Sequence, residues 1–258
     1  MEFIKANYLD TSTQLVVNSN TSSAENIIDR DQAVQYFSQG FNNDTTTTTI
    51  RINFDETLSV SRIAILGCNW KSFTVFYNGA TANTFSLTST GATTSSNFTT
   101  NSETSLFLRA TAVNCTSVSF DVKSTQVSNS EKAVGHIILS DTHIVFPIIP
   151  SAKNYTPDVV PKQIVHTLSD GGTRTHTVKD KLATKIKLQY ISQSFRDDLK
   201  TLFDLHTNFI FAPFGTTTGW DEYIFDCVWP GKFEFFKYSD DAATAGFTGS
   251  IELKETPG

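Results

Sequence analysis

The chain has 258 residues, of which 39% are hydrophobic and 18% charged, and it uses Phe 21 times but Met once. This composition is typical of a folded, strand-rich protein and excludes a disordered one, and the length suits two ordinary domains or one large β domain. The formal net charge is −6, whereas nucleic-acid-binding proteins usually carry an excess of basic residues, so nucleic acid is not expected as a partner.

No segment approaches the ~18 consecutive apolar residues of a membrane span. The start, Met-Glu-Phe-Ile-Lys, lacks the basic-then-apolar pattern of a secretory signal. We therefore expect that the protein does not insert into a membrane. We also expect that it is synthesised in a cytoplasm.

Short strands separated by polar loops are predicted before about residue 140. Ile50–Phe54 alternates between apolar and polar residues, as a half-buried strand does, and the continuous apolar run Ile63–Leu66 indicates a strand covered on both faces. Phe73–Tyr77 alternates again and stops at Asn78-Gly79, a strong turn signal. With further strands at 106–108, 118–122 and 137–139, and no helix between them, the pattern predicts a β-sandwich of the jelly-roll type.

The three cysteines, Cys68, Cys115 and Cys227, are far apart and each lies in an apolar context. Buried, reduced thiols are the preferred interpretation. A single disulfide and a reactive thiol are the alternatives.

Four prolines, Pro147, Pro150, Pro157 and Pro161, fall within a short stretch. Because proline removes backbone donors, this density predicts a stiff connection. We place a linker at 148–161, between a domain at 1–147 and a second domain at 162–258.

The second part of the chain mixes strands with one helix. Strands at 164–168 and 173–178 flank a turn at 169–172, and Ile186, Leu188 and Tyr190 alternate with polar residues. An apolar stripe at helical spacing then predicts a helix of about three turns, formed by Phe195, Leu199, Leu202 and Phe203, with Ser194 as its cap. Strands follow at 209–211, 223–225, 233–238 and 251–253. One helix on an antiparallel sheet or split barrel makes this an α+β domain in a mainly β protein.

Two groups of residues resemble known modules. The order of Asn26–Asp31, Ile50–Phe54 and Val60–Trp70 resembles the opening of galactose-binding-like (discoidin-type) jelly rolls carried by phage tail proteins. Phe209–Pro213 and the ending Gly249–Pro257 resemble the tail-tube or distal-tail domains of long-tailed phages, although the usual distal tail protein has its ring-forming domain first.

The resemblance implies a non-enzymatic structural component of a phage or phage-like tail, located in the virion. It implies a cyclic homo-oligomer at the distal tail or baseplate that contacts other tail proteins and turns the jelly roll outward. The alternative is a carbohydrate-binding adhesion protein that recognises host surface glycans.

Candidate sites are few. Trp220 follows a polar Gly/Thr loop and, with Tyr223, is a candidate glycan or intersubunit contact; Trp70 and Trp229 are the other aromatic candidates, and core packing is favoured for Trp70. A three-residue hairpin loop would set His166 opposite His176, as a metal pair or, preferably, as a solvated cross-strand pair. Asp29, Asp31, Asn43 and Asp44 are ordinary turn formers, with a structural calcium site as the alternative.

No nucleophile elbow, phosphate-binding glycine loop, zinc-protease motif or paired-cysteine motif occurs. We therefore predict no catalytic residue, no metal and no cofactor. A glycan hydrolase that uses scattered carboxylates is a further alternative.

Overall fold

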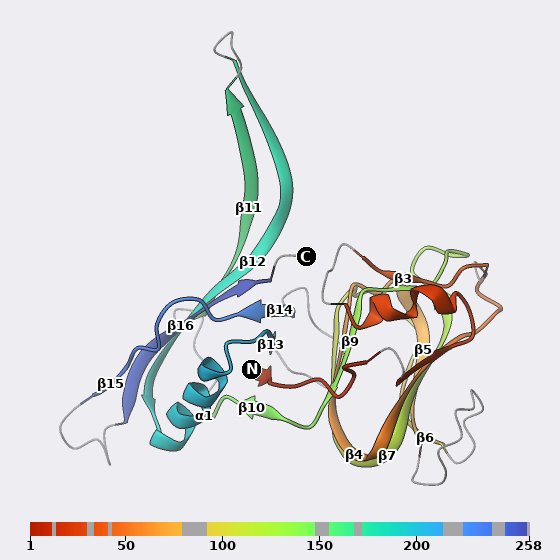
Figure 1. Ribbon diagram of the computed structural model, residues 1–258, viewed down its shortest axis with the longest axis horizontal. Coiled ribbons are helices and arrows are strands. Elements are labelled where there is room, and N and C mark those ends of the chain that lie inside the picture. Colours follow the sequence, from red (N-terminus) through yellow and green to blue (C-terminus); the bar gives the residue numbers. More distant parts are fainter. Residues whose placement is uncertain are drawn as a thin grey trace. The chain divides into compact units, whose positions relative to one another are not determined.

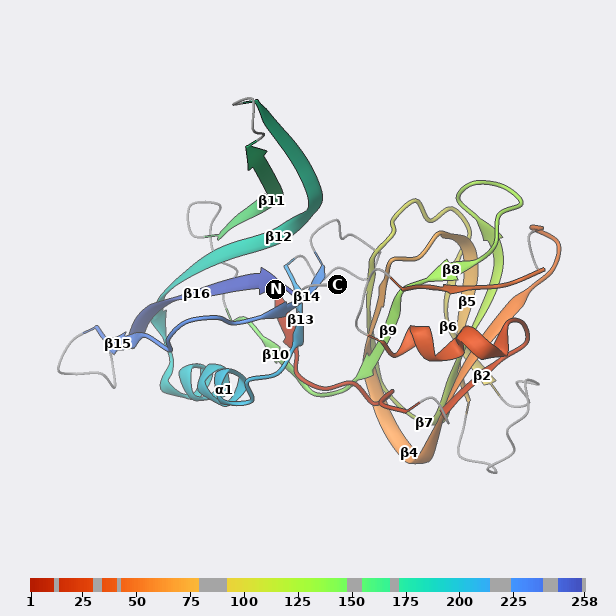
Figure 2. The ribbon, with the colours of Figure 1, turned by 45° about the horizontal axis from the view of Figure 1, so that its top comes forward.

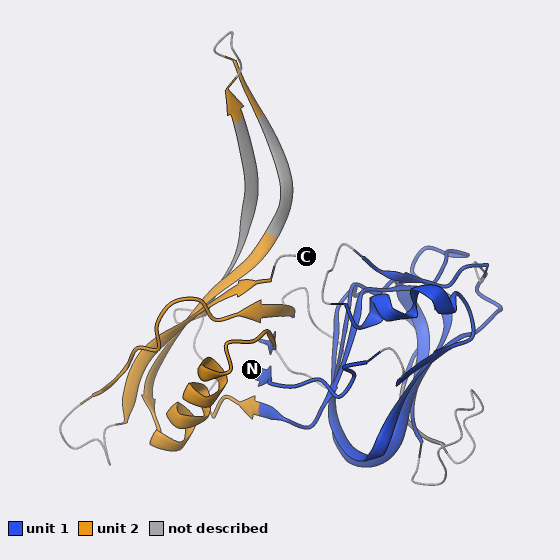
Figure 3. Cartoon of the chain, in the orientation of Figure 1, with its two compact units in different colours: residues 1–143, 210–224, 257–258 blue, residues 144–209, 225–256 orange. Residues whose placement is uncertain are grey.

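The computed structural model describes residues 1–11, 14–29, 34–40, 43–78, 92–147, 155–167, 172–213, 224–238 and 246–256. The chain forms two compact units, coloured separately in Figure 3. Unit 1 comprises residues 1–143, 210–224 and 257–258, and unit 2 comprises residues 144–209 and 225–256. These units follow contacts within the chain, and the domain limits at residues 147 and 162 stay a prediction.

Unit 1 contains a curled antiparallel sheet consistent with the predicted jelly-roll β-sandwich (Figure 1, Figure 2). Across the sheet the strands follow the order β2 (Leu15–Val17), β4 (Thr48–Leu66), β7 (Leu106–Thr125), β5 (Trp70–Asn78) and β6 (Ala92–Phe98), and β9 (His136–Ser140) pairs with β4. The unit also holds the 3-10 helix η2 (Thr21–Ile27) and the pair formed by β3 (Tyr36–Phe37) and β8 (Ala133–Val134). β1 (Glu2–Ile4) pairs with residues 210–212 of β13 (Phe209–Ala212), and β10 (His143–Val145) and β13 lie where the chain passes between the units.

β4 is one long strand where the sequence predicts two. Its pairing with β7 shifts register twice, and such bulges bend a strand without ending it. The run at 63–66 is covered on both faces, as predicted, because alternate residues enter two different apolar clusters: Ile63 and Ile65 in one, Ala64 and Leu66 in the other.

The core of unit 1 is built around aromatic rings. Trp70 is fully buried, with its ring centroid 5.3 Å from that of Phe73 and 6.0 Å from that of Phe120. This confirms core packing as the role of Trp70.

Unit 2 is an antiparallel sheet with one helix in its described part, which confirms the predicted α+β class. β12 (Thr173–Ile191) pairs with β11 (Tyr155–Thr167) on one side and with β16 (Phe247–Glu255) on the other, and β16 also pairs with β14 (Phe225–Val228) and β15 (Phe235–Lys237). Residues 155–161, predicted as part of a linker, belong to β11, and residues 148–154 lie outside the described residues. Pro157 and Pro161 are tolerated there because β11 is the last strand of the sheet order, where one row of backbone donors needs no partner.

Helix α1 (Gln193–Asp204) buries Phe195, Leu199 and Leu202, as its predicted stripe requires. The predicted cap, Ser194, is wrong, because Ser194 lies inside the helix. Ser192 has the extended backbone of a cap residue, and its hydroxyl accepts a hydrogen bond from the Phe195 N–H at 3.2 Å.

Tyr190 also departs from its predicted pattern. Ile186 and Leu188 are buried, but the alternation breaks at a bulge between Leu188 and Ile191, and Tyr190 is 56% exposed. A bulge turns the side chain that follows it to a new direction, which a strict two-residue period cannot anticipate.

Candidate functional site

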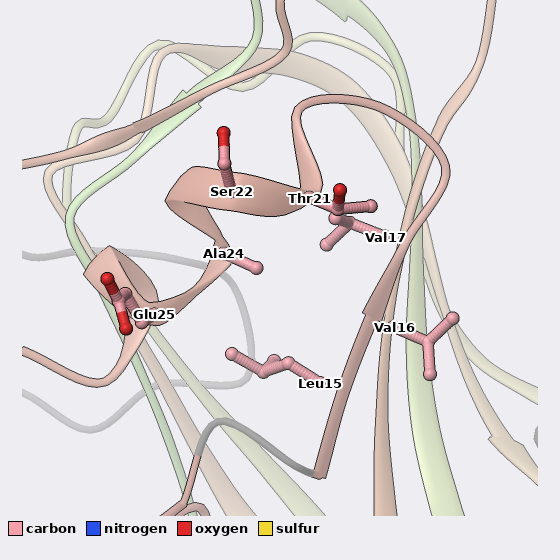
Figure 4. A pocket seen from close by; sticks show the side chains of 7 residues that line it. All are labelled: Leu15, Val16, Val17, Thr21, Ser22, Ala24 and Glu25. Atoms are coloured by element: carbon pink, nitrogen blue, oxygen red, sulfur yellow. The ribbon is translucent and has the colours of Figure 1, made fainter.

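A pocket of about 340 Å³ lies in unit 1 between strand β2 and helix η2. Its apolar wall comes mainly from β2, and its polar wall from the first turns of η2. Figure 4 shows Leu15 reaching from β2 beneath the helix, with the methyl group of Ala24 directed toward it. The lining is formed by Leu15, Val16, Val17, Thr21, Ser22, Ala24 and Glu25.

Hydrogen bonds hold both sides of this pocket. β2 pairs with β4 in the register Leu15 to Ile52, so the apolar wall is part of the main sheet. Before η2, the Tyr36 hydroxyl donates to the carbonyl of Ser19 at 2.8 Å; at its end, Nδ1 of His136 lies 2.7 Å from the carbonyl oxygen of Ile27. These contacts fix the helix against the sandwich, so the pocket is preformed.

The chemistry of the pocket is amphipathic. Leu15, Val17 and Ala24 give an apolar floor, whereas Thr21 and Glu25 bring exposed oxygen atoms. Within the described residues, the Glu25 carboxylate has no hydrogen-bond or ion-pair partner. A ligand with one apolar face and several hydroxyl or ammonium donors fits this arrangement, while an anionic ligand would be repelled by the carboxylate.

The sequence-predicted site residues that the structure describes do not line this pocket. Trp220 and Tyr223 lie outside the described residues, so their role as glycan or interface contacts stays a prediction. Trp229 is half-buried in unit 2, with its ring centroid 5.3 Å from that of Phe203 and 5.7 Å from that of Phe233. Trp229 is thus a member of an aromatic cluster.

The predicted opposition of His166 and His176 is wrong. His166 pairs with Arg174, and His176 pairs with Ile164, because the strands are joined by residues 168–172 and not by a three-residue loop. The pairing is offset by two residues from the one that would set His166 opposite His176, so the two histidines lie at diagonal positions. Among the described residues, no group of three or more His, Cys, Asp or Glu side chains is placed to hold a metal.

The oxygen-rich loop considered for calcium contains a cation of the protein's own. Lys132 is fully buried, and its Nζ donates to the carbonyl oxygens of Asn43 at 2.5 Å and of Thr46 at 3.0 Å. Asp44 accepts from the backbone N–H of Thr125 at 3.2 Å, and Asp31 lies outside the described residues. Burial lowers the pKa of Lys132, and the charge of Asp44 acts in the opposite direction. Asn43 and Asp44 therefore serve as turn residues, the preferred interpretation of the sequence.

The three cysteines are buried free thiols, as predicted. Burial raises the pKa of Cys68 and of Cys115 to about 12, which keeps both protonated and unreactive. No helix in the described part of the chain is long and apolar enough to span a membrane.

Sequence reasoning missed the pocket. Its residues carry ordinary signals: a short apolar strand, a polar turn and Thr21-Ser22-Ser23 leading into a helix. The available clue was the single acidic residue, Glu25, on a helix that is otherwise neutral. That clue gains meaning only once the helix is placed against β2.

No family model and no curated protein matches the chain. Several solved structures are similar to part of the chain. One is chitosan-binding module 1 of a chitosanase/glucanase from Paenibacillus sp. IK-5. The two sequences are 14% identical, the match covers 52% of this chain and 98% of the module, and the TM-score is 0.44. Module 2 of the same enzyme, in complex with chitotriose, is 16% identical over 48% of this chain and 93% of that one, with a TM-score of 0.41. A module termed CpGH89CBM32-6 from Clostridium perfringens is 13% identical over 52% and 98%, with a TM-score of 0.40. At TM-scores this low, none of these likenesses assigns a ligand to this chain.

Proposed function

We propose that the chain is a non-catalytic carbohydrate-binding protein that holds a neutral or amino sugar unit in the pocket between β2 and η2. The observation that carries this proposal is the pairing of an apolar floor with an available carboxylate. Leu15 and Ala24 supply the floor, and Glu25 accepts hydrogen bonds from sugar hydroxyl or ammonium groups.

The size and rigidity of the pocket support the same ligand class. A volume of about 340 Å³ lies at the lower end of the range for small-molecule sites, ~300 to 1,000 Å³. Because the pocket is held by the sheet and by hydrogen bonds at both ends of η2, little ordering is needed on binding, which favours affinity for a small ligand.

Isothermal titration calorimetry of the full chain tests this function. The probes are galactose, N-acetylglucosamine, galacturonic acid and chitotriose, the last being the ligand of one compared module. We expect binding of a neutral or amino sugar and weaker binding of the uronic acid. Glu25→Gln removes a charged acceptor worth ~1.5 to 3 kcal/mol per hydrogen bond, so the dissociation constant should rise about tenfold or more.

Two further variants make the test specific to the pocket. Ala24→Leu fills the space beneath η2 and should abolish binding. Glu56→Gln is the matched control, because Glu56 is exposed in unit 1 but does not line the pocket. Absence of binding by all four sugars, or equal affinity of the Ala24→Leu variant, would contradict the proposal.

A structural role is the second candidate function, and a specific feature of unit 2 favours it. β12 pairs with β16 only over residues 183–191, so residues 173–182 and their β11 partners form a two-stranded arm with no third strand among the described residues (Figure 1). Open strand edges are surfaces onto which another copy can add a strand. In this candidate the chain is a homo-oligomeric ring component of a phage-like tail, contacts other tail proteins and resides in the virion.

Light scattering across a concentration series tests the structural candidate. A discrete multimer that is lost when residues 163–177, the end of the arm, are replaced by a short Gly/Ser turn would support it. A persistent monomer would oppose self-assembly through the arm.

A further inference from the structure

Three large aromatic side chains are exposed together on unit 2. Tyr190 is 56% exposed, Phe236 64% and Tyr238 53%. Phe236, in β15, and Tyr238, directly after that strand, are two residues apart and so share one face, while Phe235, just before Phe236, is buried. The ring of Tyr190 lies with its centroid 4.6 Å from that of Tyr238. We call these three residues the aromatic face.

The backbone is shaped to place Tyr190 there. Tyr190 has a φ of 58°, in the left-handed region that aromatic residues seldom adopt, and it lies in the bulge of β12. The neighbouring Gly246 passes so close that an added Cβ would lie 2.8 Å from the carbonyl oxygen of Ile191. Both the unfavourable backbone and the solvent-exposed ring are costs in the free protein, and such strain is characteristic of functional positions.

The face is aromatic and not generally apolar. These three rings are the exposed large apolar side chains in the described parts of β12, β15 and β16 and at Tyr238, directly after β15. No exposed large aliphatic side chain accompanies them in these described parts. Interaction with the Tyr238 side chain raises the pKa of Tyr190, and the two rings lie in contact. Thr248 lies opposite Phe236 in the register, and its hydroxyl donates to the carbonyl of Leu188 at 3.0 Å, which leaves its oxygen as an acceptor. Gln189, next to Tyr190, is exposed and adds an amide group.

We propose that the aromatic face is a second binding surface, which takes the pyranose rings of an extended polysaccharide. Aromatic rings pack against the C–H face of a sugar, and the tyrosine hydroxyls and Thr248 are suited to its hydroxyl groups. Because the rings lie at neighbouring positions on an open sheet, they can contact several successive sugar units of a polymer. A closed pocket would instead suit one sugar unit. This surface is built from residues of unit 2 alone and does not rest on the pocket of unit 1.

Sedimentation of the full chain with insoluble chitin, with microcrystalline cellulose and with insoluble mannan tests this proposal. We expect retention on at least one polymer and a rise of about tenfold or more in the dissociation constant for Phe236→Ala and for Tyr238→Ala, the equivalent of ~1.4 kcal/mol or more. Tyr238→Phe keeps the ring and should weaken retention less than Tyr238→Ala. Phe37→Ala is the matched control, because Phe37 is an exposed aromatic residue of unit 1.

The outcomes separate the two sites and the two kinds of partner. Retention that Ala24→Leu leaves intact and Phe236→Ala removes supports the aromatic face, whether or not the pocket binds sugar. No retention of the wild-type chain on any polymer, or equal retention of the Phe236→Ala variant, overturns the proposal. Concentration-dependent self-association that Phe236→Ala abolishes, without polymer binding, identifies the face as a protein contact and also overturns it.

Discussion

Replacing Glu2 with Gln should destabilise unit 1, because Glu2 is the centre of a buried ion cluster. Its side chain is 0% exposed, and one carboxylate oxygen lies 2.6 Å from Nε of Arg62. The other oxygen is paired with Arg109. The side chain of Arg62 is 12% exposed and that of Arg109 is 29% exposed. Both guanidinium charges are therefore balanced largely by the Glu2 carboxylate.

The magnitude follows from what Gln can retain. Removing one partner of a buried ion pair costs ~3 to 5 kcal/mol. The arginines keep part of their hydration and the amide oxygen of Gln can accept from one of them, so we expect a loss of about 2 to 3 kcal/mol in the free energy of unfolding. Glu252→Gln is the matched control: Glu252 lies 2.6 Å from Lys185, but their side chains are 54% and 50% exposed. Such an exposed pair contributes ~1 kcal/mol or less.

Urea unfolding followed by circular dichroism measures both variants. With a slope near ~2 kcal/mol per molar urea, the unfolding midpoint should fall by about 1 M or more for unit 1 in Glu2→Gln and by less than about 0.5 M for unit 2 in Glu252→Gln. Equal shifts would refute the assignment of a buried, energetically coupled cluster. The slope itself should not change, since the surface exposed on unfolding is the same.

Three further predictions concern other parts of the chain. Ser192→Ala should cost ~1 kcal/mol of stability through loss of the helix cap, whereas Ser194→Ala should be close to neutral; thermal unfolding compares them. Gly249→Ala should destabilise unit 2 by at least ~1 to 3 kcal/mol, because its added Cβ would collide with the backbone oxygen of Glu234, and a wild-type melting temperature would contradict this. Hydrogen bonds from Ser61 and Ser59 lower the pKa of the Asp141 carboxyl group in the folded protein. The ionised carboxylate therefore stabilises the fold fully above the pKa that Asp141 has in the unfolded chain, and this stabilisation is lost as the pH falls through its pKa in the folded protein. Asp141→Asn should therefore flatten the loss of stability below about pH 4, as followed by acid titration of the folded fraction.

Local periodicity predicted the parts of the fold that depend on local sequence. The stripe of Phe195, Leu199 and Leu202 recurs at helical spacing, and the same residues are buried in α1. The burial of Trp70 was likewise predictable, because a large apolar residue between two strands of a sandwich usually packs into the core.

Pairing between strands could not be predicted in the same way. The register of β11 with β12 depends on how many residues the turn takes, and a difference of two residues separates His166 from His176. Tyr190 shows the same limit, because its exposure depends on a bulge and on the close approach of Gly246, which lies directly before β16 and more than 50 residues later in the sequence. The pocket needed the placement of η2 against β2, which no linear pattern encodes.

The buried ammonium group of Lys132 has a consequence for how unit 1 responds to its surroundings. A loop organised by a dissociable ion loses its shape when that ion is withdrawn, but here the cation is attached to the chain. The turn at 43–46 should therefore keep its conformation in chelating buffers. Its order depends instead on a segment 89 residues later in the sequence, so a nascent chain can complete this turn only after Lys132 has left the ribosome.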